Sequence, residues 1–313
     1  MKIFNFKTIS GLKINGKYII FPQNSNRYTK AAFDVIFLHA FPLDSDMYID
    51  NFKDTKFIRA LNKIALKKGR IRLYLPDLPG FGESDLLNSK PKDLSFYVDV
   101  VNEIVDHFQI KRFILGGCSM GGYIALEYLR NNTDFIEGLV LIDTKPSADD
   151  EEKIQNRLDT IEIIDKSLET YSEDENLNIK MEKLYEQDDK IKIFLDSLHS
   201  NVTSLYCRRN NPEIAKEILT LMKKQRALGI IHALNGIAGR KDTSNVLKIL
   251  NINTLILVGE NDTITPLETA KEMKDIISNS ILEIIPLAGH LSNMENLIEF
   301  NQKLLNWLQI TFN

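Results

Sequence analysis

Residues 117–122 read Gly-Cys-Ser-Met-Gly-Gly, and they lie between an apolar run at 113–115 and a helical pattern. A serine between a strand and a helix sits on a tight, strained turn that pushes its hydroxyl out of the sheet edge. The turn is crowded, so small residues are needed two positions before and after the serine, and Gly117 and Gly121 supply them. This stretch therefore predicts that Ser119 is a nucleophile; the alternative is a glycine-rich turn with an incidental serine.

Apolar runs alternate with helical patterns on both sides of this turn. Several runs are apolar without alternation, as expected of strands buried on both faces of a parallel sheet. The strand-like runs lie at 34–38, 71–75, 113–115, 139–142, 254–258 and 281–285, after a predicted hairpin at 3–8 and 13–21. The helical patterns lie at 57–68, 94–108, 120–130, 265–277 and 294–308. Strands and helices that take turns form βαβ units, so the sequence predicts an α/β fold with a mostly parallel sheet.

The alternation stops between about residues 145 and 242, in a stretch that is charged and lacks strand-like runs. Helices are predicted there at 151–166, 177–199 and 212–234, with a mobile loop at 170–178. The strand pattern then resumes at Leu255. We therefore expect two units. They are a core of residues 1–143 and 243–313, and a helical cap of residues 144–242, inserted after the sixth strand and lying over the strand ends.

Composition limits the classes of partner and location. The 313 residues carry a net charge of −4 without a long basic run, which argues against nucleic acid as a partner. No stretch approaches roughly 18 consecutive apolar residues, and the first ten residues lack the apolar run of a signal peptide, so no membrane span is expected. Cys118 and Cys207 do not make a disulfide framework, which predicts a reducing compartment and a cytoplasmic protein.

A serine hydroxyl is a weak nucleophile, so a general base must accompany it. The chain has five histidines, and His290 directly follows the last strand-like run. It thus lies at the carboxyl edge of the sheet, where enzymes of this architecture place their sites. His107, His199 and His232 fall within helical patterns or the cap and are interpreted as packing or surface residues. His290 is therefore the predicted base.

The base needs an acidic residue to fix its tautomer and to stabilise the imidazolium. Asp262 follows the run at 254–258 and is preferred. Asp143, which follows the run before it, is the rival, and Glu260 is a weaker one. The resulting order of nucleophile, acid and base along the chain is that of serine hydrolases with an α/β sheet.

A tetrahedral intermediate also needs two N–H donors around its oxyanion. The amide of Met120 at the start of the helix should supply one, and the amide of Phe41, after the run at 34–38, should supply the other. Losing one such donor typically raises the barrier by about 3 kcal/mol. His39, Met47 and Tyr123 are expected to line the substrate pocket, with a place in the core as the alternative for such residues.

Seven segments, in order, resemble motifs of the α/β-hydrolase superfamily. They are HAFPLDSDMY (39–48), LPDLPGFGESD (75–85), GCSMGGYIAL (117–126), LVLIDTKPSADDEEKIQNR (139–157), AGRKD (238–242), LVGENDTITP (257–266) and IPLAGHLSNMENLIEFN (285–301). The subgroup they resemble contains small carboxylesterases, enol-lactonases such as 3-oxoadipate enol-lactonase, and non-haem serine haloperoxidases. The resemblance implies the α/β-hydrolase fold, an eight-stranded sheet with flanking helices and a helical cap between strands six and seven. Two departures are Ala40, where the family usually has glycine, and a longer segment at 170–194.

These observations predict a carboxylesterase that cleaves small esters through an acyl-enzyme on Ser119. The alternatives are an enol-lactonase, a C–C bond hydrolase, an amidase like proline iminopeptidase, or a non-catalytic ligand-binding member of the same fold. A serine in place of aspartate at 119 argues against haloalkane dehalogenases and epoxide hydrolases. No metal or organic cofactor is expected, since no H-E-x-x-H or Cys/His cluster is present. The expected partner is a small-molecule ester, and a homodimer is left open.

Overall fold

The centre of the molecule is an eight-stranded sheet, which the computed structural model describes together with the rest of residues 1–23, 32–86 and 89–312. The strands are β1 (Lys2–Lys7), β2 (Lys13–Phe21), β3 (Ala32–Leu38), β4 (Arg70–Pro76), β5 (Phe113–Cys118), β6 (Ile136–Ile142), β7 (Asn253–Gly259) and β8 (Ser280–Ile285). Their order is β1-β2-β4-β3-β5-β6-β7-β8. The pairs β1–β2 and β2–β4 are antiparallel, and all later pairs are parallel. The predicted mostly parallel sheet is confirmed, and the predicted hairpin forms its antiparallel edge.

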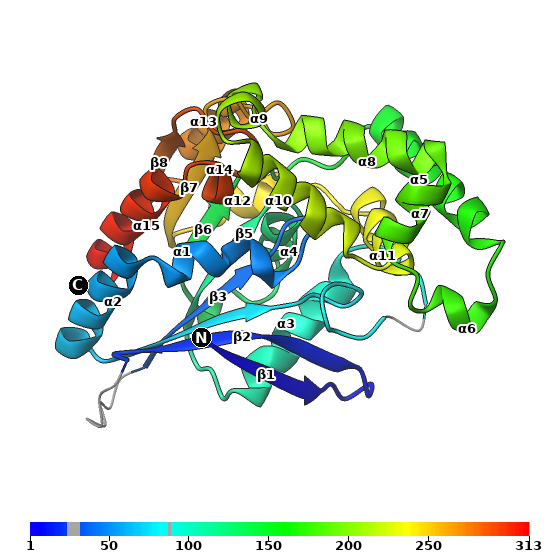
Figure 1. Cartoon of the computed structure of the whole chain (residues 1–313). Coiled ribbons are helices and arrows are strands. Elements are labelled where there is room, and N and C mark those ends of the chain that lie inside the picture. The colour runs from blue at the N-terminus through cyan, green and yellow to red at the C-terminus, as the bar shows by residue number, and fades with distance from the viewer. Residues whose placement is uncertain (24–31, 87–88, 313) are drawn as a thin grey trace.

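Helices cover both faces of this sheet (Figure 1). Alternate side chains of a strand point to opposite faces. Accordingly, Val35 and Phe37 of β3 pack in one buried cluster with α2 and α15, whereas Ile36 and Leu38 pack in another with α3 and α4. The core helices are α1 (Ile49–Lys53), α2 (Thr55–Lys68), α3 (Ser95–His107), α4 (Met120–Tyr128), α12 (Ser244–Ile249), α13 (Leu267–Ile276), α14 (Ser292–Glu295) and α15 (Leu297–Thr311).

Helices fill the interval between β6 and β7, and Figure 1 shows them in green to yellow, gathered along one side of the molecule. They are α5 (Glu151–Leu168), α6 (Glu173–Asn176), α7 (Met181–Gln187), α8 (Asp189–Val202), α9 (Leu205–Asn210), α10 (Pro212–Lys223) and α11 (Ala227–Ala238). The backbone N–H of Thr243 donates to the carbonyl of Pro146 at 2.9 Å, so the two ends of the insertion lie side by side. We call residues 144–242 the cap.

Two helices predicted in the cap are each divided into two. The segment 177–199 breaks at Asp188, whose carboxylate caps the first turn of α8. The segment 212–234 breaks around Gln225, which is buried and donates from its Nε2 to Asp44 Oδ2 at 2.9 Å. Apolar periodicity continues across both breaks, which is why the pattern alone did not show them.

Two further predicted elements differ in detail. Residues 170–178, expected as a mobile loop, contain the short helix α6, which begins with a capping box formed by Ser172 and Glu175. The pattern at 294–308 corresponds to α14 and α15, which are separated at Asn296. The side chain of Asn296 caps the first turn of α15, so the chain restarts as a helix there.

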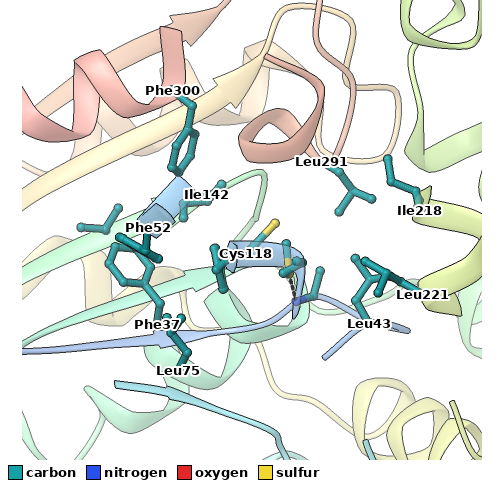
Figure 2. Packing of buried hydrophobic residues seen from close by; sticks show 14 of the residues in the cluster. Phe37, Leu43, Phe52, Leu75, Cys118, Ile142, Ile218, Leu221, Leu291 and Phe300 are labelled. Atoms are coloured by element: carbon teal, nitrogen blue, oxygen red, sulfur yellow. Dashed lines mark hydrogen bonds between the residues drawn. The ribbon is translucent and has the colours of Figure 1, made fainter. Parts of the chain in front are cut away.

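The cap packs directly on the core through α10. Ile218 and Leu221 of this helix belong to the same buried cluster as Leu43 and Leu291 of the core, and Figure 2 shows these four side chains close to one another. Burying one such aliphatic side chain contributes about 1.5–3 kcal/mol. The contact therefore fixes the position of α10 over the loops that follow β3 and β8.

Candidate active site

Ser119 occupies the turn between β5 and α4, and its backbone has φ 50° and ψ −111°. A non-glycine residue in this region is strained and persists only where its surroundings hold it. Here the Ser119 N–H donates to the Ile142 carbonyl at 2.9 Å, and the Ser119 carbonyl accepts from Thr144 Oγ1 at 2.9 Å. Strand β6 and the residue that follows it closely thus fix the turn, and Ser119 as a whole residue keeps 7% of its surface exposed.

His290 connects Ser119 to a carboxylate. Its Nε2 lies 2.8 Å from Ser119 Oγ, and its Nδ1 lies 2.8 Å from Asp262 Oδ2. Since Nδ1 donates to the carboxylate, Nε2 is free to accept from the serine hydroxyl. The three residues follow β5, β8 and β7, so the carboxyl ends of parallel strands bring them together.

The surroundings of Asp262 favour its charged form. Its Oδ1 accepts from the backbone N–H groups of Ile264 (2.8 Å) and Thr265 (3.0 Å), and its Oδ2 accepts from Thr265 Oγ1 at 2.5 Å. Burial opposes the charge, but the His290 imidazole and these donors outweigh it and lower the pKa of Asp262. Burial likewise opposes protonation of His290, yet the Asp262 charge and hydrogen bond raise the pKa of His290 above its ordinary 6.5.

Asp143, the rival acid, has a different set of partners. Its Oδ1 accepts from the Gly259 N–H at 2.8 Å, and its Oδ2 accepts from the Ser292 N–H at 3.0 Å and Oγ at 2.6 Å. Burial, together with the nearby charge of Asp262, raises the pKa of Asp143 to about 8. Asp143 therefore joins the loops after β7 and β8, whereas Asp262 is the carboxylate that contacts the imidazole.

The two amides expected around an oxyanion belong to Met120, which directly follows Ser119, and to Phe41, which lines the same cavity as Ser119. Met120 is the first residue of α4, so its N–H has no partner within the helix. Phe41 follows β3, and no hydrogen-bond acceptor for its N–H is found in the part of the chain that the structure describes. The preceding amide, that of Ala40, is already used, because it donates to Met47 Sδ at 3.2 Å. Met120 and Phe41 thus remain the candidate donors.

Comparison with known proteins agrees with this geometry. Residues 35–297 match the family model described as alpha/beta hydrolase fold. The chain belongs to the α/β-hydrolase family. It is 29% identical over 267 residues to the AB hydrolase superfamily protein YisY of Bacillus subtilis, covering 82% of this chain and 84% of that protein. It is 25% identical over 251 residues to a 2-hydroxy-6-oxononadienedioate/2-hydroxy-6-oxononatrienedioate hydrolase of Escherichia coli, covering 78% of each.

Solved structures of the same fold include several hydrolases. A thermophilic esterase from Thermogutta terrifontis superposes with a TM-score of 0.77 at 24% identity, covering 100% of both chains. The enol-lactonase from Burkholderia xenovorans superposes with a TM-score of 0.71 at 16% identity, covering 95% of this chain and 97% of that one. At these identities the likeness establishes the α/β-hydrolase fold of the chain.

A cavity of about 250 Å³ in this α/β hydrolase is lined by both Ser119 and His290. Its apolar lining comes from core and cap together: Phe41, Phe194, Leu198, Val202, Leu234, Ile237 and Ile264. Its polar lining comes from α4 and α5: Tyr123, Lys153, Asn156, Arg157 and Thr160. The sequence did not single out the four α5 residues, although their spacing of three and four places them on one helix face.

Of the three residues expected to line the pocket, only Tyr123 does so in the described structure. His39 is fully buried, where its Nε2 accepts from the Leu78 N–H at 3.0 Å and its ring lies edge-on to Phe81. Met47 turns its sulfur toward the Ala40 amide and lies outside the cavity. Both residues follow β3 but pack beneath the loop, a direction that the local sequence does not encode.

The cap also contacts the loop that carries His290. The backbone N–H of His290 donates to the carbonyl of Val202 at 3.1 Å, at the end of α8. Ser204 donates from its N–H to Glu295 Oε2 at 3.0 Å and from its hydroxyl to the Leu287 carbonyl at 2.9 Å. Three hydrogen bonds thus join the end of α8 to the segment around the candidate base.

The glycines of the turn in this hydrolase are required by close backbone approach. A Cβ on Gly117 would lie 2.2 Å from the backbone of Gly121, and a Cβ on Gly121 would lie 2.2 Å from the Leu38 carbonyl oxygen. Neither contact can be relieved by rotating a side chain, since backbone atoms make it. The spacing of the glycines around Ser119 therefore reflects the packing of α4 on β5 and β3.

We expect Gly117→Ala to lower the free energy of unfolding by about 3 kcal/mol or more, the upper end of what overpacking costs. The reason is the backbone clash with Gly121. Chemical denaturation followed by circular dichroism measures the change. Gly236→Ala in α11 is the control, because its Cβ would approach neighbours no closer than 3.3 Å. Equal midpoints for Gly117→Ala and the wild type would contradict the crowding argument.

Proposed function

We propose that this α/β hydrolase cleaves small carboxylic esters through an acyl-enzyme on Ser119. The observation that carries the proposal is the continuous hydrogen-bonded path from Ser119 Oγ through His290 to Asp262, with 2.8 Å at each step. The path opens into a largely apolar cavity of about 250 Å³, a size suited to a small acyl group. Enol-lactones and amides pass through the same kind of acyl-enzyme and remain the alternatives.

In this proposal His290 Nε2 takes the hydroxyl proton while Ser119 Oγ attacks the ester carbonyl. The amides of Phe41 and Met120 donate to the oxyanion of the tetrahedral intermediate. Asp262 holds Nδ1 protonated and stabilises the imidazolium that forms. Collapse of the intermediate breaks the bond to the alcohol, which leaves with the proton from Nε2. Water, deprotonated by the same nitrogen, then attacks the acyl-enzyme and releases the acid and Ser119.

Hydrolysis of p-nitrophenyl acetate and butyrate, compared with that of proline p-nitroanilide, tests the proposal. Ester turnover well above amide turnover is expected, because the cavity offers apolar walls beside the serine. A series of p-nitrophenyl esters of increasing acyl length then locates the limit of the cavity. Efficient amide turnover with negligible ester turnover would instead assign the chain to the amidases. No turnover of either, together with no labelling of Ser119 by a fluorophosphonate, would favour a non-catalytic member of the fold.

The acid limb of the pH profile of kcat/KM should have its midpoint above pH 6.5, because the limb reports the His290 pKa, which Asp262 raises. The base must be neutral, so activity rises with pH through this pKa. In Asp262→Asn the charge is lost while burial of the imidazole remains, so the midpoint should move to lower pH. The rate of labelling by a fluorophosphonate, measured against pH, gives the same midpoint independently of turnover. An unchanged midpoint in Asp262→Asn would show that Asp262 does not set the pKa of the base.

A reducing compartment stays part of the proposal. Cys118 and Cys207 are both unpaired and buried, and burial raises the pKa of the Cys207 thiol to about 12. Thiols of this kind are unreactive and suit a protein that does not depend on disulfides. Separately, no helix in residues 1–23, 32–86 and 89–312 is long and apolar enough to cross a membrane.

A further inference from the structure

One side of the cavity beside Ser119 is cationic. Lys153 and Arg157 line it from the same face of α5, one turn apart, while the rest of the wall is mainly apolar. Lys153 is exposed and pairs with Asp150, so it lies at the rim. Arg157 is the more enclosed of the two, with 24% of its side chain exposed. The candidate nucleophile and a guanidinium group thus line the same cavity, and apolar side chains make up most of the wall between them.

The carboxylate behind Arg157 does not balance the positive charge around it. Asp149 Oδ2 accepts from Arg157 Nε at 2.6 Å and from Arg240 Nη1 at 2.8 Å, and its Oδ1 lies 3.6 Å from Lys145 Nζ. Three cations therefore share one buried carboxylate. Burial opposes its ionisation, but the two guanidinium groups lower the pKa of Asp149 to about 2, so it is charged. Asp242 is a second carboxylate whose charge acts on Arg240, and the three cations still outnumber these two carboxylates.

Arg157, a residue of the cavity wall, has hydrogen-bonding capacity left. Only its Nε donates to Asp149, and neither Nη group has an acceptor among the residues that the structure describes. A guanidinium group presents paired N–H donors that match the two oxygens of a carboxylate. Arg240 lies with its guanidinium carbon 4.2 Å from the centre of the Tyr123 ring, and Tyr123 is one helical turn after Ser119. The excess positive charge therefore lies next to Tyr123, which lines the cavity together with Ser119.

We propose that the substrate carries a carboxylate remote from the scissile carbonyl, and that the Nη groups of Arg157 bind it. The apolar middle of the cavity then holds the carbon chain between the two ends, and Lys153 adds a second cation at the rim. A neutral ester of the same length leaves the Arg157 donors unpaired in a half-buried site, which selects against it. This assignment of substrate class rests on the proposed esterase function of Ser119.

Monomethyl adipate and methyl hexanoate are a matched pair for the test, since they differ only in a terminal carboxylate in place of a methyl group. We expect the wild type to show a higher kcat/KM for monomethyl adipate, measured by titration of the acid released. Arg157→Gln should reduce that value by about tenfold to hundredfold, the range of a charge-assisted hydrogen bond. The value for methyl hexanoate should change little. Lys166→Gln is the control, because this exposed residue lies on the same helix, pairs with Glu162 and does not line the cavity beside Ser119.

A wild type that prefers methyl hexanoate would overturn the proposal without any variant. So would equal losses for both esters in a folded Arg157→Gln. If that variant does not fold, two other measurements test the proposal. Lys153→Gln should reduce the preference for monomethyl adipate over methyl hexanoate, and high salt should reduce it in the wild type, because Lys153 is exposed and its charge is screened by salt. Binding of monomethyl adipate and methyl hexanoate to Ser119→Ala, measured by calorimetry, tests the carboxylate site independently of ester hydrolysis. Selective binding without turnover in the wild type would reject the esterase and keep the carboxylate site.

Discussion

Ser119→Ala should reduce kcat for p-nitrophenyl butyrate by about 10⁶-fold, the loss seen when the nucleophile of a comparable triad is removed. The alanine keeps the backbone of the turn but leaves the carbonyl with no attacking oxygen, and His290 then has only water to activate. Steady-state kinetics measures the loss. Covalent labelling by a fluorophosphonate, followed by mass spectrometry, should disappear in the same variant.

Ser84→Ala is the control for the labelling experiment. Ser84 is another buried serine in a loop at the sheet, but its hydroxyl donates to the Asp77 carbonyl at 2.6 Å, and within the described residues it makes no hydrogen bond to a histidine. We expect this variant to lose some stability and to retain labelling. Labelling that persists in Ser119→Ala would show that another residue is the nucleophile and would remove the basis of the proposed function.

Asp262→Asn should lower kcat by about 10⁴-fold, as when the orienting carboxylate of such a triad becomes an amide. The amide NH₂ cannot accept from His290 Nδ1–H, so the imidazole is driven to the tautomer with its proton on Nε2. That proton then points at Ser119 and prevents the base from accepting. The variant should remain folded, since Asn can keep the hydrogen bonds to the backbone of Ile264 and Thr265.

Asp143→Asn is the matched change at the rival acid. It should reduce stability more than turnover, whereas Asp262→Asn should reduce turnover more than stability. The two oxygens of Asp143 accept three hydrogen bonds from Gly259 and Ser292, and an amide NH₂ faces one of those N–H groups whichever way it turns. Thermal unfolding should therefore occur at a lower temperature, while turnover should fall far less than in Asp262→Asn. A larger loss of turnover in Asp143→Asn would reverse the roles assigned to the two carboxylates.

The sequence could predict that Ser119, His290 and Asp262 lie together, as their hydrogen bonds show, because each is tied to a strand end by local chain geometry. The strained turn at Ser119 demands small residues at fixed spacing, and this demand is visible as Gly117 and Gly121. The other two residues directly follow strands whose apolar runs are unmistakable. Parallel strands carry such residues to one edge of the sheet, so their proximity follows from the topology.

The residues that line the cavity could not be predicted from the sequence in the same way. Whether Met47 or His39 faces the cavity beside Ser119 depends on side-chain direction in an irregular loop, and both are buried outside that cavity. Arg157 carries no motif: its importance comes from Asp149 and Arg240, and the latter lies at the opposite end of the cap sequence. Contacts of this kind are set by the packing of helices, for which a single sequence gives no local signal.

The hydrogen bond from the His290 amide to Val202 bears on how such proteins diversify. An insertion after the sixth strand looks like a module that could be exchanged wholesale between relatives to alter specificity. In this chain, however, Val202 and Ser204 supply part of the support for the loop that carries the imidazole. A chimaera that replaces the insertion must therefore retain residues 202–204, or it changes the lining of the cavity and the support of the His290 loop at the same time.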